Sequence, residues 1–123
     1  MSDIPILIQY ARIFRKRFKQ LRKKYPSVQE DVAQLVAQLK NGETPGDRIT
    51  GVSGRVIYKV RLRIGSSTKG KSGGYRVIYF VKTATHIILI NIYVKAEQRD
   101  ISSTEILQII DEMAEDESDT PNR

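Results

Sequence analysis

The sequence predicts an α+β fold in which an N-terminal strand, a helical hairpin, a three-stranded antiparallel meander and a C-terminal helix share one sheet. Three observations predict it: two helical stripes of apolar residues, then three strand-like runs in succession, then a third helical stripe. With 123 residues, the chain is long enough for one domain and too short for two. We therefore expect a single domain over residues 1–113 and an acidic, disordered tail over residues 114–123.

The N-terminal third predicts a short strand and two helices. The run from Ile4 to Tyr10 is apolar and rich in β-branched residues, as in a strand. Pro26 ends the first helix, because it lacks a backbone N–H and disfavours helical geometry in the residue before it. Ser27 and Glu30 have the spacing of a capping box for the second helix, which ends at Asn41-Gly42. The two helical stripes are Phe14, Phe18, Leu21 and Tyr25, and then Val28, Val32, Leu35, Val36 and Leu39.

Three strands are expected after a loop rich in Gly and Pro at residues 42–54. In the first strand, residues 56–64, apolar and cationic side chains alternate, which sends Lys59, Arg61 and Arg63 to one face. The runs 75–81 and 86–94 are more uniformly apolar, as in central strands covered on both faces, and we expect Tyr75 and Tyr79 to be core residues.

The last predicted element is a helix after a second capping box. Ser102 and Glu105 have the required spacing, and the apolar stripe that follows is Ile106, Ile109, Ile110 and Met113. Beyond Met113 the chain is acidic and has nothing apolar to bury.

Charge is unevenly distributed along the chain. The net charge is +7, but six acidic residues against one basic residue from Asp111 to Arg123 leave −5 at the C-terminus. Residues 1–110 have 20 basic and eight acidic residues and therefore carry +12. Such a body suits nucleic acid or another polyanion, although a solvated basic surface kept for solubility would give the same numbers.

Several classes of function are excluded by composition. Without cysteine there is no disulfide scaffold, thiolate nucleophile or cysteine-ligated metal. His86 is the one histidine, so a metal site built on several imidazoles is excluded, and we expect no metal and no cofactor. No apolar run reaches the roughly 20 residues of a membrane span, and the apolar stretch at the N-terminus precedes the basic one, the reverse of a secretory signal. We expect a cytoplasmic protein with no membrane partner.

Residues 65–72 fit the phosphate-loop pattern G-x-x-x-x-G-K-[ST], but the context does not. That loop holds phosphates at the N-terminus of a helix that begins directly after the lysine. Here a strand-like run follows from Tyr75. We interpret the segment as a basic hairpin loop in which Lys69 and Lys71 can touch a backbone phosphate.

The strand-borne cations, the glycine-rich loop and the run from Gly70 to Tyr79 resemble the toxins of the RelE/ParE superfamily, especially its HigB-like branch. Tyr93-Val94-Lys95 at the end of the last strand and Leu21 to Pro26 in the helical hairpin add to the resemblance, which extends from about Ile4 to Met113. It implies a small RelE-like fold. It also implies a bacterial or archaeal ribonuclease toxin that enters the ribosomal A site, cuts messenger RNA there and is silenced by a cognate antitoxin.

The resemblance implies catalytic roles for Lys59, Arg61, Arg76 and Lys95. Metal-independent cleavage uses the neighbouring 2′-hydroxyl as nucleophile, so the site needs proton transfer and stabilisation of the phosphorane-like transition state. Arginines suit the phosphate and a lysine among other cations suits proton transfer. In the best-studied members an additional catalytic Arg and a Tyr stand where this sequence has Ala96 and Ser102.

Further residues are candidates for RNA binding: Arg63, Lys69, Lys71, Tyr93, Arg15, Lys16, Lys19 and Lys23. Tyr93 could stack on a base or share a proton, and the cations of the first helix could contact ribosomal RNA or form a solvated face. Alternating cations also protect edge strands against aggregation. A ParE-like gyrase inhibitor that cleaves nothing and a non-catalytic RNA-binding relative are the alternatives to a ribonuclease.

Overall fold

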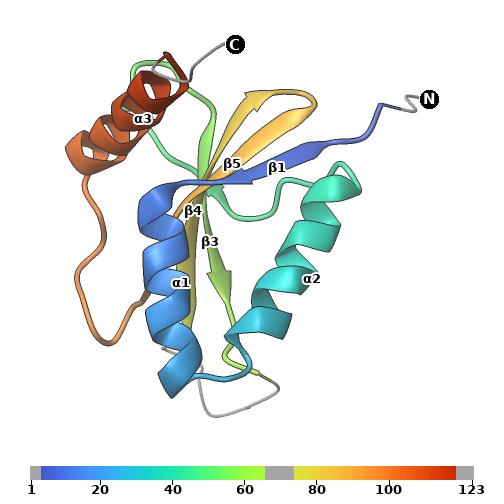
Figure 1. The fold of residues 1–123 in the computed structure, drawn as a ribbon, viewed down its shortest axis with the longest axis vertical. Coiled ribbons are helices and arrows are strands. Elements are labelled where there is room, and N and C mark those ends of the chain that lie inside the picture. Colours follow the sequence, from blue (N-terminus) through green and yellow to red (C-terminus); the bar gives the residue numbers. More distant parts are fainter. Residues whose placement is uncertain (1–3, 66–73, 119–123) are drawn as a thin grey trace.

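A computed structural model describes residues 4–65 and 74–118, and the predicted α+β fold is confirmed (Figure 1). Within these residues a five-stranded mixed sheet has the order β1-β5-β4-β3-β2 and is combined with three helices. Lys69, Lys71 and most of the segment that resembles a phosphate loop lie outside the described residues, as do residues 119–123. The elements are β1 Leu7–Tyr10, α1 Arg12–Lys24, α2 Val28–Lys40, β2 Asp47–Arg48, β3 Ile57–Leu62, β4 Tyr75–Thr83, β5 His86–Val94 and α3 Ser103–Ser118.

The meander β3-β4-β5 is antiparallel, and β1 joins its far edge in parallel with β5. The predicted loop 42–54 contains β2, a two-residue strand that pairs with Tyr58 and Lys59 of β3. So short a strand has no apolar alternation, and for that reason the sequence pattern does not indicate it.

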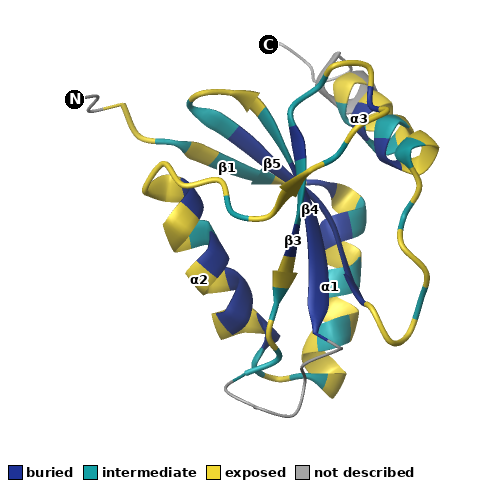
Figure 2. Ribbon diagram, turned by 180° about the vertical axis from the view of Figure 1, so that it is seen from behind, coloured by how far each residue is buried: buried dark blue, intermediate teal, exposed yellow. Residues whose placement is uncertain are grey.

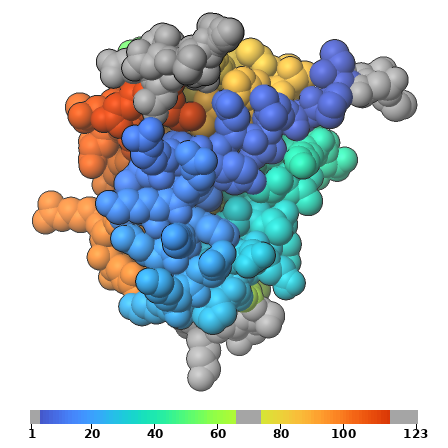
Figure 3. All heavy atoms as spheres, in the orientation of Figure 1, coloured from blue at the N-terminus to red at the C-terminus, as the bar shows by residue number. Residues whose placement is uncertain are grey.

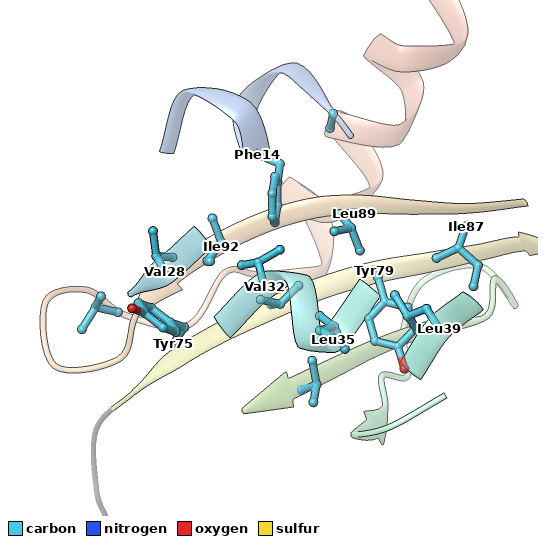
Figure 4. Packing of buried hydrophobic residues seen from close by; sticks show 14 residues of the cluster. Phe14, Val28, Val32, Leu35, Leu39, Tyr75, Tyr79, Ile87, Leu89 and Ile92 are labelled. Atoms are coloured by element: carbon cyan, nitrogen blue, oxygen red, sulfur yellow. The ribbon is translucent and has the colours of Figure 1, made fainter. Parts of the chain in front are cut away.

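Two hydrophobic layers cover the sheet, one on each face. Helices α1 and α2 pack against one face, where Phe14, Leu35, Tyr75 and Tyr79 are almost completely buried (Figure 4). Helix α3 packs against the other face through Ile106 and Ile110. The expectations that β4 and β5 are covered on both faces and that Tyr75 and Tyr79 belong to the core are confirmed.

Of the two predicted capping boxes, one is wrong and one is confirmed. Ser27 has helical dihedral angles and its hydroxyl donates to Asp31 Oδ2 at 2.9 Å instead of capping α2. In the second box, the N–H of Glu105 donates to Ser102 Oγ and the N–H of Ser102 donates to Glu105 Oε1, both at 3.2 Å.

The last helix is longer than predicted. Helix α3 continues to Ser118, so the expectation of a disordered tail is wrong for residues 114–118. Once the capping box and the apolar stripe have formed the first turns, each further residue adds a hydrogen bond, and Ala and Glu are good helix formers. Among the described residues, no helix is long and apolar enough to cross a membrane.

Substituting Ser102→Ala should lower the free energy of unfolding by about 1 kcal/mol, because the backbone N–H of Glu105 loses its acceptor, the Ser102 hydroxyl. Urea unfolding of the full chain measures the change. Thr104→Ala, an exposed position in the first turn of the same helix, is the control and should change stability by no more than about 0.5 kcal/mol. Equal stability of Ser102→Ala and the parent protein would contradict the expectation.

Candidate functional site

The predicted alternation of β3 is confirmed and places its cations on the face that α3 shares. Val60 belongs to the layer under α1 and α2, and Ile57 belongs to the layer under α3. Lys59 and Arg61 alternate with Val60 and therefore lie on the same face as Ile57. Figure 2 shows α3 at one end of this face, while the opposite end of β3 and β4 has no helix over it.

Three side chains form a row across the strands at that end. Arg61 lies opposite Arg76, which in turn lies opposite Tyr93. Residues directly opposite in antiparallel strands have Cβ atoms about 5 Å apart, and like charges so placed destabilise a sheet. Arg61 is exposed, whereas Arg76 is only 7% exposed and is therefore held in place by its surroundings.

Tyr93 reaches this face because of a β-bulge in β5. Ile78 pairs with Asn91 and the next residue, Tyr79, pairs with Leu89, which leaves Ile90 as an extra residue. The extra residue reverses the alternation, so that Tyr93 lies on the sheet face that α3 shares, in the same hydrophobic cluster as Ile57 and Ile106. The buried Asn91 supports the bulge, because its Oδ1 accepts the N–H of Ile92 at 2.8 Å.

Asp100, in the loop between β5 and α3, connects these groups. The hydroxyl of Tyr93 donates to Asp100 Oδ1 at 2.9 Å. Lys59 Nζ lies 3.4 Å and Lys95 Nζ 3.2 Å from Asp100 Oδ2. Three of the four predicted catalytic cations thus come from separate elements: Lys59 from β3, Arg76 from β4 and Lys95 from the end of β5. We call Lys59, Arg61, Arg76 and Lys95 the cation cluster.

The charges of Asp100 and Tyr93 are fixed by this arrangement. The hydrogen bond from Tyr93, the one from Lys95 and the charge of Lys59 lower the pKa of Asp100, and burial followed by the bond to Asp100 raises the pKa of Tyr93 to about 12. At neutral pH the carboxyl is therefore ionised and the phenol protonated. A lowered carboxyl pKa stabilises the folded state above the usual aspartate range, and this contribution is lost as the pH falls through the lowered value.

The same loop is attached to α1 on its other side. Glu97 forms an ion pair with Lys24 and accepts a hydrogen bond from the Tyr25 hydroxyl at 2.7 Å. Arg17 donates to Gln98 at 2.7 Å. Figure 3 shows this orange segment beside the blue α1. The loop thus lies between α1 and the cation cluster, with contacts to both.

A comparison with known protein families adds to these observations. Residues 11–120 match the family described as the RelE toxin of the RelE/RelB toxin–antitoxin system. The chain belongs to this RelE toxin family. The match runs from α1 to α3 and includes every member of the cation cluster. As a RelE-family toxin, the protein has an antitoxin as its partner.

Other predicted site residues of this RelE-family toxin lie elsewhere. Tyr93 is 1% exposed, so its ring is not available to stack on a base as predicted: the bulge turns it into the hydrophobic cluster on the face that α3 shares. Arg63 follows the end of β3 and lines a hollow of about 230 Å³ together with Arg61 and Gln34. Ser102 caps α3, and this local structural role accounts for the serine at that position.

Four cations of α1 are among the predicted RNA-binding residues: Arg15, Lys16, Lys19 and Lys23. All four are exposed, but α1 packs on the face opposite the cation cluster. Arg15 lines an apolar hollow of about 460 Å³ between α1 and α2, whose walls include Phe14, Phe18 and Val32. In this RelE-family toxin the hollow and the cation cluster are therefore separate surfaces.

Asp100 is the site residue that sequence reasoning missed. The available signal was an acidic residue in the loop that follows the last cationic strand end, but its contacts with Lys59 depend on how the loop turns. Among the residues described, no three His, Asp or Glu side chains come together as possible ligands of a metal ion.

Proposed function

We propose that this RelE-family toxin acts in the cytoplasm of a bacterial or archaeal cell, where it inhibits translation by cutting messenger RNA in the ribosomal A site. The observation that carries the proposal is the cation cluster, which sits on a sheet face that α3 covers at only one end. Permanently charged guanidinium groups and two ammonium groups suit an RNA phosphate in its transition state.

The roles follow from exposure and position. Arg76, buried and fixed, stabilises the charge on the phosphorane-like transition state, and the exposed Arg61 opposite it draws the phosphate in. The 2′-oxygen attacks phosphorus and loses its proton, while the 5′-oxygen leaves and takes one up. Lys59 and Lys95 are the candidates for these proton transfers, because both of their amino nitrogens lie beside Asp100 Oδ2. One lysine, in its neutral amine form, would accept the proton of the 2′-hydroxyl, and the other, as an ammonium, would donate a proton to the leaving 5′-oxygen.

Tyr93 and Asp100 do not suit the role of general base. The raised pKa of Tyr93 keeps its proton on the phenol, and that proton is donated to Asp100. The lowered pKa of Asp100 makes its carboxylate a weak base near neutral pH.

The antitoxin would need to cover the cation cluster, and we expect an acidic, amphipathic segment to do so. The apolar hollow between α1 and α2 lies on the opposite face of the sheet. An antitoxin segment packed there would leave the cation cluster open, so a second segment would have to reach around the sheet. Membership of the HigB-like branch rests on the sequence resemblance and is part of this proposal.

The test is expression from a tight promoter, followed by mapping of messenger ends and by cleavage on purified ribosomes. We expect growth arrest and cuts within translated regions, and Arg61→Gln should lower the cleavage rate about tenfold or more. Lys40→Gln, an exposed cation at the end of α2, is the matched control and should leave the rate unchanged.

Three outcomes would contradict the proposal. Uncut messenger RNA in arrested cells would show that the protein does not act by cutting messenger RNA. Inhibition of gyrase supercoiling by the purified protein would favour the ParE-like alternative. RNA binding without cleavage or growth arrest would favour a non-catalytic relative.

A further inference from the structure

A carboxylate in the middle of a site for RNA phosphate needs an explanation, because it repels the ligand. Asp100 is 43% exposed and its Oδ2 faces two ammonium groups, those of Lys59 and Lys95, which are 35% and 41% exposed. The two lysines belong to different elements. Their side chains therefore converge on one oxygen atom that neither strand supplies.

The lysine contacts of Asp100 are of a kind that another anion can replace. Optimal hydrogen bonds between an ammonium and a carboxylate measure about 2.7–2.9 Å, and those of Asp100 measure 3.2 and 3.4 Å. Exposed pairs of this geometry are weak. A phosphate oxygen accepts hydrogen bonds from the two ammonium groups as a carboxylate oxygen does. In RNA that phosphate is part of a polyanion, whose other phosphates add to the attraction.

Asp100 does not depend on the lysines for its own position. Its other oxygen, Oδ1, accepts the hydroxyl of the buried Tyr93 at 2.9 Å. The loop is also attached to α1 through Glu97 and Gln98. Loss of the lysine contacts would therefore leave the loop attached at both of its other anchors.

We infer that Asp100 is an internal stand-in for the RNA phosphate: it holds Lys59 and Lys95 together in the free protein and gives them up when RNA binds. The inference rests on the proposed function for the identity of the ligand. Asp100 is a positioning residue that acts through the two lysines, and it has two opposite effects. It lowers the affinity for RNA, because it competes with phosphate, and it raises the rate of cleavage, because the lysines are already in place.

The experiment measures RNA binding separately from cleavage. Binding of the full-length protein to a 2′-O-methyl RNA oligonucleotide, which cannot be cut, is measured at low salt for the parent and for Asp100→Asn. We expect Asp100→Asn to bind about three- to tenfold more tightly, as the loss of two exposed ion pairs predicts, with the gain shrinking as salt rises. Cleavage of natural RNA at saturating protein should become slower in the same variant.

Two controls separate the stand-in from a general charge effect. Glu43→Gln removes one exposed negative charge just after α2 and should change binding less than twofold. In a Lys95→Met background, Asp100→Asn should increase the affinity for RNA by less than half the factor seen in the parent protein, because one of the two lysines is absent.

Unchanged or weaker binding of a folded Asp100→Asn variant would overturn the inference. So would equal tightening by Glu43→Gln, or full tightening in the Lys95→Met background. If the oligonucleotide binds neither the parent nor Asp100→Asn at low salt, the lysines do not take up phosphate and the inference fails. Thermal unfolding identifies a variant that fails to fold. If Asp100→Asn does not fold, Asp100→Ser, which is also neutral, takes its place, and the same outcomes support or overturn the inference.

Failure of the inference can be told apart from failure of the proposed function. If Asp100→Asn binds the oligonucleotide more tightly but the parent protein cuts no RNA, the inference about Asp100 is supported and the proposed ribonuclease function is contradicted. If the parent protein cuts RNA but Asp100→Asn binds the oligonucleotide no more tightly, the ribonuclease function is supported and the inference about Asp100 is contradicted.

Discussion

Substituting Arg76→Gln should slow RNA cleavage by about 10²- to 10³-fold, which is the usual effect of removing one fixed donor from a transition-state site. Arg76 lies between Arg61 and Tyr93 in a cross-strand row and is only 7% exposed. Burial lowers the local dielectric and so strengthens its interaction with a charge that develops on the phosphate. Its charge is near enough to Tyr93 to oppose the rise in the pKa of that phenol.

Single-turnover cleavage on ribosome-bound messenger measures the effect. Because a buried arginine also contributes to folding, urea unfolding of Arg76→Gln must accompany the assay, and Arg76→Lys provides a second variant that keeps the charge but loses the planar fork. Arg63 is an exposed cation just beyond the end of β3, and Arg63→Gln is the matched control, which should slow cleavage by less than tenfold. A folded Arg76→Gln protein that cuts within threefold of the parent rate would show that Arg76 does not stabilise the transition state.

The faces of β3 could be predicted from sequence because a strand that buries one side has a strict period of two. Val60 lies in the layer under α1 and α2 and Lys59 and Arg61 lie on the other face, as the alternation predicts. The boundaries of β5 at His86 and Val94 and the end of α1 before Pro26 were predictable for similar local reasons.

The position of Tyr93 could not be predicted, because it depends on one extra residue in β5. Counting by twos from Leu89 would place Tyr93 under α1 and α2, and the bulge at Ile90 reverses this. Nothing in the run His86–Val94 marks the bulge except Asn91, a polar residue in an apolar strand whose side chain bonds to the next backbone N–H. An isolated polar residue in a buried strand is therefore a usable signal for a bulge.

The contacts of the loop between β5 and α3 were out of reach for a different reason. Lys24 and Glu97 are 73 residues apart in sequence, and Lys59 and Asp100 are 41 apart. Local patterns contain no information about such pairs.

The two capping boxes have the same spacing in sequence, and only the local backbone geometry distinguishes them. Ser27 has helical dihedral angles and bonds to Asp31, whereas Ser102 shares a reciprocal pair of bonds with Glu105.

Substituting Gly74→Ala should cost about 3–5 kcal/mol of stability and disrupt the row of Arg61 and Arg76 at the same time. Gly74 directly precedes β4 and has a φ of +88°, a conformation that costs an L residue about 1–2 kcal/mol. A Cβ there would also collide with the backbone carbonyl oxygen of Leu62, which cannot move aside as a flexible side chain could. Relief of the collision requires β3 to separate from β4 where Leu62 pairs with Tyr75, next to the arginine pair.

Two other glycines calibrate this expectation, and thermal or urea unfolding measures all three. A Cβ at Gly46 would lie 2.5 Å from the carbonyl oxygen of Lys59, on the other edge of β3, so Gly46→Ala should cost about as much as Gly74→Ala. Gly42 has nearly the same φ, +89°, but nothing lies within 4 Å of its Cβ position, so Gly42→Ala should cost only about 1–2 kcal/mol. If Gly74→Ala and Gly42→Ala destabilise the protein equally, the close approach of the glycine to β3 contributes nothing. If Gly74→Ala is more destabilising than Gly42→Ala and also cleaves RNA more slowly than Gly42→Ala at a temperature where both are folded, the spacing of β3 and β4 at Arg61 and Arg76 sets the activity.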